Sequence, residues 1–99
     1  MRVKITEPAE TDLEQGYLFY EQQQTGLGAY FLDALYADID SLSFYAGIHL
    51  ELWGYRRLLS KRFPFAVYYS TDDDDTVLVM AILDCRRNPS WIRKNLIKR

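Results

Sequence analysis

Residues 54–84 read GYRRLLSKRFPFAVYYSTDDDDTVLVMAILD, and they contain the two segments that most clearly predict paired strands. The run Thr76–Asp84 is apolar throughout its interior, as expected of a strand covered on both faces, so we place it at the centre of a sheet. Phe65–Ser70 is aromatic and β-branched. Pro64 can stand only at the first position of that strand or on an edge, because proline donates no ladder hydrogen bond.

The segment Thr71–Asp75 between these strands is predicted to be a hairpin loop. Its four consecutive aspartates repel one another and must stay solvated, which places them at the far tip of the hairpin. A calcium loop alternates its oxygen ligands and places a glycine and a terminal glutamate at fixed positions, and none of this is present. We therefore expect no metal site here and no cofactor elsewhere.

A third strand is predicted upstream, at Tyr55–Leu59. Arg56 and Arg57 are adjacent, so alternation places one cation on each face of this strand. That placement is the first indication of function, because cations on a sheet can contact an anionic partner.

The first half of the chain predicts one strand and two helices. Arg2–Thr6 alternates like a short strand, and Thr6 is positioned as the N-cap of a helix from Pro8 to Gln24. The two glycines of residues 25–28 end this helix, and a second helical periodicity runs from Leu27 to Leu42. Two helices joined by so short a loop must be antiparallel neighbours.

The two remaining segments are less regular. Residues 44–53 look like a connection into the sheet, in which His49 is expected to be a surface or packing residue and Trp53 to cap the core. At the other end, Pro89 stops the central strand and Ser90 is expected to cap a short helix. The order of elements predicts an α+β fold with an N-terminal strand, an antiparallel two-helix hairpin on one face of a small antiparallel sheet, and a short C-terminal helical tail.

Composition is consistent with one globular domain over residues 1–99, since 48% of the residues are hydrophobic and no segment resembles a linker. The longest apolar run is far shorter than the roughly 20 residues of a membrane span, and Met1–Ile5 is not followed by a signal-peptide core. We expect a cytoplasmic protein without a membrane partner. Cys85 is the single cysteine, so no internal disulfide is possible, and it is expected to be a small core or rim residue.

The net charge of −2 conceals an asymmetry between the two halves. Residues 1–50 contain two cations and eight anions, whereas residues 51–99 contain ten cations and six anions, four of them in the loop tip. The remaining surface of the second half is therefore basic and can attract phosphates or an acidic protein.

Several short motifs, in their order and spacing, resemble one known family. They are Ala9–Leu13, Phe31–Leu35, Tyr55–Leu58, Arg62–Phe65, Tyr68–Tyr69 and Cys85–Trp91. Together the motifs cover nearly the whole chain and resemble RelE/ParE-type toxins, of the plasmid-stabilisation kind in type II toxin–antitoxin modules. The resemblance implies the helical hairpin and antiparallel sheet, and it implies a co-expressed antitoxin that neutralises the toxin in a hetero-oligomer.

Two mechanisms occur in the family that the motifs resemble. One branch cleaves messenger RNA on the ribosome; the other, which this sequence resembles more closely, is described as inhibiting DNA gyrase. Many relatives have a histidine where this chain has Cys85, and a sequence pI of about 5.3 is unusual for a ribosome-binding toxin.

Metal-free RNA cleavage requires a proton acceptor, cations for the developing charge and an acid for the leaving oxygen. Arginines of the second half can supply the cations, but a general base is hard to find. The candidates for catalysis are Lys61, Arg62, Tyr68 and Tyr69, with His49 as a further possible base, and the alternation of the tyrosines with Phe65 and Val67 favours packing in the sheet.

The first hypothesis is therefore a ParE-like toxin that acts by binding its target, gyrase by resemblance. Its contact surface would be a basic rim and the tail to Arg99, with Arg56, Arg57, Arg62, Arg86, Arg87, Trp91 and Arg93 as target-binding residues. The second hypothesis is a RelE-like, ribosome-dependent endoribonuclease that uses the same cations on messenger RNA. The third is a degenerate relative that has lost toxicity and persists as a binding partner.

In either active case, the antitoxin is expected to lay an amphipathic, acidic segment over open apolar and basic surface. The aromatic residues considered for that contact are Tyr17, Tyr20, Phe31 and Tyr36, of which the first three are expected to pack in the core.

Overall fold

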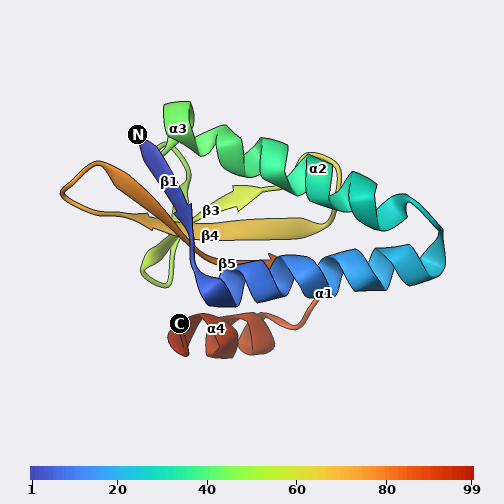
Figure 1. The fold of residues 1–99 in the computed structure, drawn as a ribbon. Coiled ribbons are helices and arrows are strands. Elements are labelled where there is room, and N and C mark those ends of the chain that lie inside the picture. The colour runs from blue at the N-terminus through green and yellow to red at the C-terminus, as the bar shows by residue number, and fades with distance from the viewer.

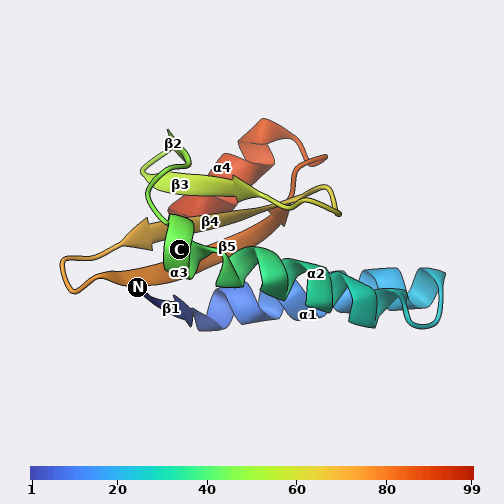
Figure 2. The ribbon, with the colours of Figure 1, turned by 90° about the horizontal axis from the view of Figure 1, so that it is seen from above.

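The computed structural model describes all 99 residues, Met1–Arg99, as three layers. A two-helix hairpin covers one face of a five-stranded sheet and a short C-terminal helix covers part of the other face (Figures 1 and 2). The strands are β1 (Arg2–Ile5), β2 (Leu50–Leu52), β3 (Tyr55–Leu59), β4 (Phe65–Thr71) and β5 (Thr76–Asp84). The helices are α1 (Glu7–Gln23), α2 (Leu27–Asp40), α3 (Leu42–Tyr45) and α4 (Pro89–Ile97). No helix combines the length and the apolar character that a membrane crossing requires.

The structure confirms the predicted α+β class, the helical hairpin and the C-terminal helical tail. The sheet has two features that the sequence did not predict. Its strand order is β1-β5-β4-β3-β2, and β1 runs parallel to β5 while every other pairing is antiparallel, so the sheet is mixed. The connection predicted at residues 44–53 contains the short edge strand β2. Trp53, expected to cap the core, instead lies in the β2–β3 turn at a φ of 53° with its side chain 39% exposed.

Strand β5 is covered on both faces, as its apolar sequence predicts. Val77, Val79 and Ile82 belong to the core under the helical hairpin, whereas Ala81 and Leu83 belong to a second cluster under α4. The alternation changes phase because the β4–β5 pairing contains an irregularity at Tyr68/Tyr69, opposite the segment of β5 between residues 79 and 81. One strand therefore contributes to both cores.

The two helices of the hairpin approach closely because glycine stands at their contact. A Cβ atom on Gly16 of α1 would lie 2.5 Å from the ring of Phe31 in α2, which is fully buried. The turn between the helices is closed by Glu21, whose carboxylate accepts hydrogen bonds from the backbone N–H groups of Gly26 and Gly28. The Glu21 carboxylate thus satisfies donors at the start of α2 that have no partner inside the helix.

Two helix caps differ from the sequence prediction. Thr6 precedes α1 as expected, but its hydroxyl donates to the Val79 carbonyl oxygen at 2.9 Å and caps no helical N–H group. At α4 the cap is Asn88, whose side chain accepts a 2.8 Å hydrogen bond from the N–H of Ser90, so Ser90 is not the cap. The Asn88 cap fits with Pro89 at the first helical position, where a missing N–H group costs nothing.

Asp12 connects three distant parts of the chain. Its carboxylate accepts a hydrogen bond from the Ile82 N–H group of β5 and forms a two-bonded ion pair with Arg99, whose guanidinium also donates to the Met80 carbonyl oxygen. The pair is largely buried, with the side chains 10% and 12% exposed. Since β1 pairs with β5 only as far as Val79, Asp12 and Arg99 satisfy backbone groups of β5 beyond that point.

We predict that Asp12→Ala lowers the free energy of unfolding by about 3–5 kcal/mol, because it leaves a buried guanidinium and a buried N–H group without a partner. Urea unfolding would measure the loss. Glu14→Ala, on the exposed side of the same helix, is the control and should change stability by less than about 0.5 kcal/mol. Equal stability of the Asp12→Ala variant and the wild type would contradict the role given to the pair.

Candidate protein-binding surfaces

One end of the sheet brings two basic loops together. The β3–β4 loop and the β5–α4 connection meet where the N–H group of Cys85 donates to the Pro64 carbonyl oxygen at 2.8 Å, beside the Phe65–Asp84 pair. Cys85 itself is exposed, so it is a residue of the rim. Four cations belong to these loops, all exposed, and we call them the basic end: Lys61, Arg62, Arg86 and Arg87.

Three of these cations are held in defined positions. The guanidinium of Arg86 binds the Asp84 carboxylate with contacts as short as 2.7 Å, and Arg62 donates to the Tyr30 hydroxyl at 2.9 Å. Arg87 lies over the ring of Trp91, with its guanidinium carbon 3.8 Å from the ring centroid. The basic end is therefore a fixed arrangement of cations beside aromatic rings, which suits contact with an acidic or phosphate-bearing partner.

The hydrogen bonds of Arg86 lower the pKa of Asp84 below its ordinary value of 3.8, against the opposing effect of partial burial. Asp84 is thus ionised at neutral pH, and Arg86 contributes less free charge to the surface than the other three cations.

Arg56 and Arg57 belong to β3 and not to these loops, and they lie on opposite faces of the strand as predicted. Arg56 pairs with Tyr69 on the face of the hairpin, where its guanidinium donates to the His49 carbonyl oxygen at 2.8 Å. Arg57 pairs with Tyr68 on the face of α4, and its Nε atom is buried without a hydrogen-bond partner. Both side chains are half-buried, unlike the exposed cations of the basic end.

The tyrosines considered for catalysis are both buried in the sheet. Tyr69 is fully buried, its hydroxyl accepts from the Gly47 N–H group at 3.0 Å, and it contacts Nδ1 of His49. Burial raises the pKa of Tyr68, which is 2% exposed. Burial and then the charge of Arg56 lower the pKa of His49, a packing residue as expected.

The two phenols are not placed to take a proton from a ribose hydroxyl, because they are inside the protein and the raised pKa of Tyr68 makes it harder to ionise. Lys61 and Arg62 are exposed and remain available to bind phosphate.

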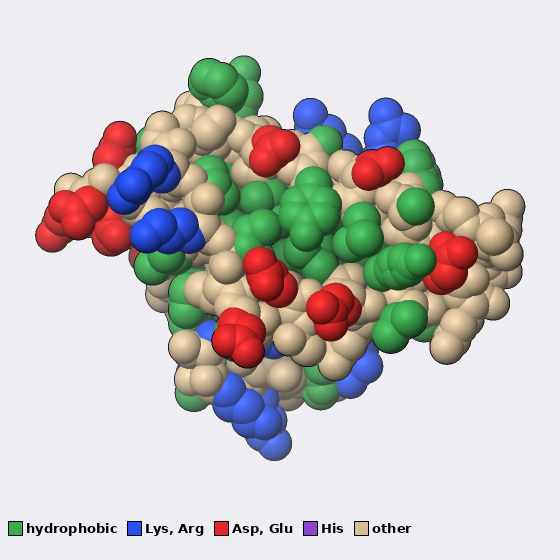
Figure 3. Space-filling view, in the orientation of Figure 1, with side chains coloured by type: hydrophobic (Ala, Val, Ile, Leu, Met, Phe, Trp, Pro, Cys, Tyr) green, Lys and Arg blue, Asp and Glu red, His purple; other side chains and the backbone are tan.

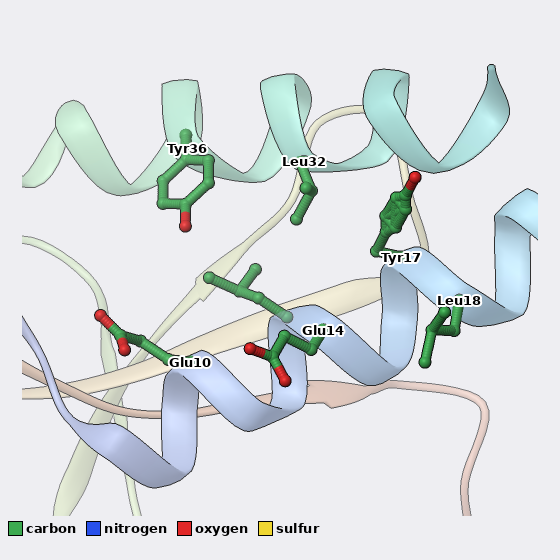
Figure 4. A pocket seen from close by; sticks show the side chains of 7 residues that line it. Glu10, Glu14, Tyr17, Leu18, Leu32 and Tyr36 are labelled. Carbon is green, nitrogen blue, oxygen red and sulfur yellow. The ribbon is translucent and has the colours of Figure 1, made fainter.

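The helical hairpin carries a second surface of the opposite character, an apolar groove between α1 and α2 (Figure 3). Its cavity has a volume of about 490 Å³. Leu32 and Tyr36 reach into it from α2, and the other side chains come from α1 (Figure 4). We call it the interhelical groove, and its lining residues are Glu10, Leu13, Glu14, Tyr17, Leu18, Leu32 and Tyr36.

Carboxylates border this groove, which changes one expectation about the antitoxin. Figure 3 shows acidic side chains on both sides of the apolar patch, and Glu10 and Glu14 belong to the lining itself. The expected acidic partner segment suits the basic end and not this groove. Of the four aromatic residues considered, Tyr20 and Phe31 are buried in the core, whereas Tyr17 and Tyr36 line the groove.

Sequence reasoning did not single out the groove, because its lining comes from two helices whose relative position the sequence does not give. A signal existed in Leu18, an apolar residue of the first helix, which is 59% exposed in the structure. An amphipathic helix with a second apolar position outside its core-facing stripe indicates a partner surface.

Fold and surfaces together define a small α+β domain with an apolar, acid-bordered groove on one side and basic loops at one end. Its sequence matches the family model described as "ParE toxin of type II toxin-antitoxin system, parDE" over residues 3–89. The chain belongs to this family of ParE toxins.

A solved structure described as the chromosomal ParDE toxin–antitoxin system from P. aeruginosa has the same fold. The TM-score is 0.69 at 22% sequence identity, and the match covers 83% of this chain and 92% of the other. Among curated protein sequences, no match is found.

We predict a pH-dependent contribution of the Arg86–Asp84 pair. Because the pKa of Asp84 is lowered in the folded protein, the stabilisation is fully present above the unfolded-state value and is lost as the pH falls through the lower, folded-state value. The stability difference between the wild type and Arg86→Gln should therefore be constant near neutral pH and shrink below pH 3.8. Urea midpoints between about pH 2 and about pH 6 would measure it. A difference that persists undiminished at the acid limit would contradict the assignment.

Proposed function

We propose that this protein is a toxin that binds and inhibits DNA gyrase and that a cognate antitoxin neutralises it in a hetero-oligomeric complex. The observation that carries this proposal is the match to the ParE toxin family over residues 3–89. The motifs of the sequence resemble the gyrase-inhibiting branch more closely than the branch that cleaves RNA. A cytoplasmic location follows from the proposal, since gyrase acts on DNA inside the cell.

The placement of the aromatic hydroxyls supports inhibition by binding over RNA cleavage. Tyr68 and Tyr69 are buried in the sheet, whereas a ribonuclease needs an accessible group to accept the proton of the ribose 2′-OH. A binding inhibitor needs only a complementary surface. The basic end provides one, and Arg93 and the half-buried Trp91 on the adjoining α4 extend it.

A supercoiling assay with purified gyrase, run beside a ribosome-dependent messenger RNA cleavage assay, tests this function. We predict inhibition of supercoiling with intact RNA. We further expect Arg62→Glu together with Arg87→Glu to weaken inhibition by about tenfold or more, because charge reversal replaces attraction by repulsion at the contact. Arg2→Glu together with Lys4→Glu on β1 makes the same change of charge at exposed positions, serves as the matched control and should inhibit like the wild type.

RNA cleavage with unaffected gyrase would replace the proposal with the endoribonuclease hypothesis. Inactivity in both assays, without growth arrest on expression, would favour a toxin that has lost its function.

For neutralisation, we propose that an amphipathic antitoxin helix occupies the interhelical groove. Helices bind such grooves through apolar residues spaced three and four apart, and the exposed parts of Leu18 and Tyr36 offer the apolar contact. Because Glu10 and Glu14 line the groove, the helix should carry lysine or arginine beside its apolar stripe. An acidic stretch of the same antitoxin would suit the basic end.

We predict that Glu10→Lys together with Glu14→Lys weakens antitoxin binding by about tenfold to a hundredfold while gyrase inhibition by the free toxin is unchanged. Isothermal titration calorimetry with the co-expressed antitoxin would measure the affinity. Asp73→Lys with Asp74→Lys, in the exposed β4–β5 loop, makes the same change of charge away from the groove and serves as the control. Tighter binding by the groove variant would show that the occupant is acidic and overturn the proposed polarity.

A further inference from the structure

Helix α4 is fixed on the face of the sheet opposite the hairpin (Figure 2). Ile92 and Leu96 are buried in the cluster beneath it, and the Tyr55 hydroxyl bonds the Leu96 carbonyl oxygen. Asn88 caps its first turn and Arg99, just beyond its end, is paired with Asp12. The side chains on the outer face of α4 therefore project from a rigid support.

The outer face of α4 is cationic, and no carboxylate pairs with its cations. Residues 85–99 contain no aspartate or glutamate. The protein forms only two ion pairs, Arg86–Asp84 and Arg99–Asp12, and neither uses a cation of the outer face. The exposed cations without a carboxylate partner on this side of the molecule are Arg87, Arg93, Lys94 and Lys98.

We propose that these four cations form a binding face for the phosphate backbone of duplex DNA. Lys94 and Lys98 are one helical turn apart, about 6 Å along the axis, and each DNA strand presents a phosphate about every 3.4 Å of duplex axis. Neighbouring cations of α4 can therefore meet successive or alternate phosphates. The four cations bind independently of sequence, since contacts to phosphates position a protein without reading bases.

The chemistry of the face favours phosphates over an acidic protein. A protein interface is usually centred on a buried aromatic or apolar anchor and is depleted in lysine, whereas this face offers lysine and arginine around one exposed apolar residue, Ile97. Trp91 is half-buried and covered by Arg87. The side-chain amide of Asn95 donates to the Trp91 carbonyl oxygen at 2.8 Å, so this donor is used within the helix.

The inference deepens the proposed function and rests on it for its cellular setting, because gyrase holds DNA and an inhibitor with this face can contact both. The phosphate-binding face belongs to α4 and the interhelical groove to the helical hairpin, and these helices cover opposite faces of the sheet (Figure 2). A toxin whose groove alone is occupied should therefore still bind DNA.

Fluorescence anisotropy with a labelled duplex of about 20 base pairs, titrated without gyrase between about 50 mM and about 200 mM salt, tests the inference. Four phosphate contacts predict a slope of log K against log salt of about −3.6. Lys94→Gln together with Lys98→Gln should reduce the slope by about 2 and leave the circular dichroism spectrum unchanged. Lys4→Gln together with Arg2→Gln removes two exposed cations from β1 and should leave the slope at the wild-type value.

Absence of duplex binding at the lowest salt, or a slope that the α4 variant does not change, would overturn the inference. Gyrase inhibition without duplex binding would refute the DNA contact alone and leave the proposed function standing. If duplex binding depends on α4 but the toxin does not inhibit gyrase, the phosphate-binding face is supported and the proposed target is refuted.

Discussion

The burial of β5 on both faces is the constraint on which the rest of the structure depends. A strand with apolar side chains on both sides must be covered twice, and a chain of 99 residues does so with a helical hairpin on one side and a nine-residue helix on the other. Each of Ile92 and Leu96 contributes about 1.5–3 kcal/mol by leaving water, so α4 belongs to the core as well as to the surface. Asp12 completes this arrangement, because it bonds β5 directly and holds Arg99 at the end of α4.

The same layering separates surfaces of opposite charge. The first half of the chain supplies the hairpin with its carboxylates, and the second half supplies the loops and the helix with the cations. A net charge of −2 therefore describes neither surface. Under the proposed function, this separation would let one small domain present a groove to an antitoxin on one side and cations to a target on the other. The buried tyrosines of β4 fit this account, since their part is to pack the sheet.

The elements with strong periodicity could be predicted from sequence, and the contacts between distant segments could not. The apolar run of β5, the glycine break after α1 and the proline at the start of α4 identify the strand, the hairpin and the tail, because each is a local property of the chain. The parallel pairing of β1, the short strand β2 and the pairing of Asp12 with Arg99 depend on tertiary contacts. The basic residues could be identified from the sequence by residue type. Their placement, with Arg56 and Arg57 on β3 and the others at the basic end, depends on strand register and on side-chain partners. The interhelical groove needed two helices in position before its lining could be recognised.

The most direct test of two separate surfaces is residue-level chemical footprinting of the folded toxin, alone, with its antitoxin and with gyrase. Carboxyl-specific labelling reports on Glu10 and Glu14, and lysine-specific labelling reports on Lys61, Lys94 and Lys98. The account predicts that the antitoxin protects the two glutamates and that gyrase in complex with DNA protects the lysines while the glutamates stay reactive. Protection of the same residues by gyrase and by the antitoxin's groove-binding helix would contradict it, since one surface would then serve both partners.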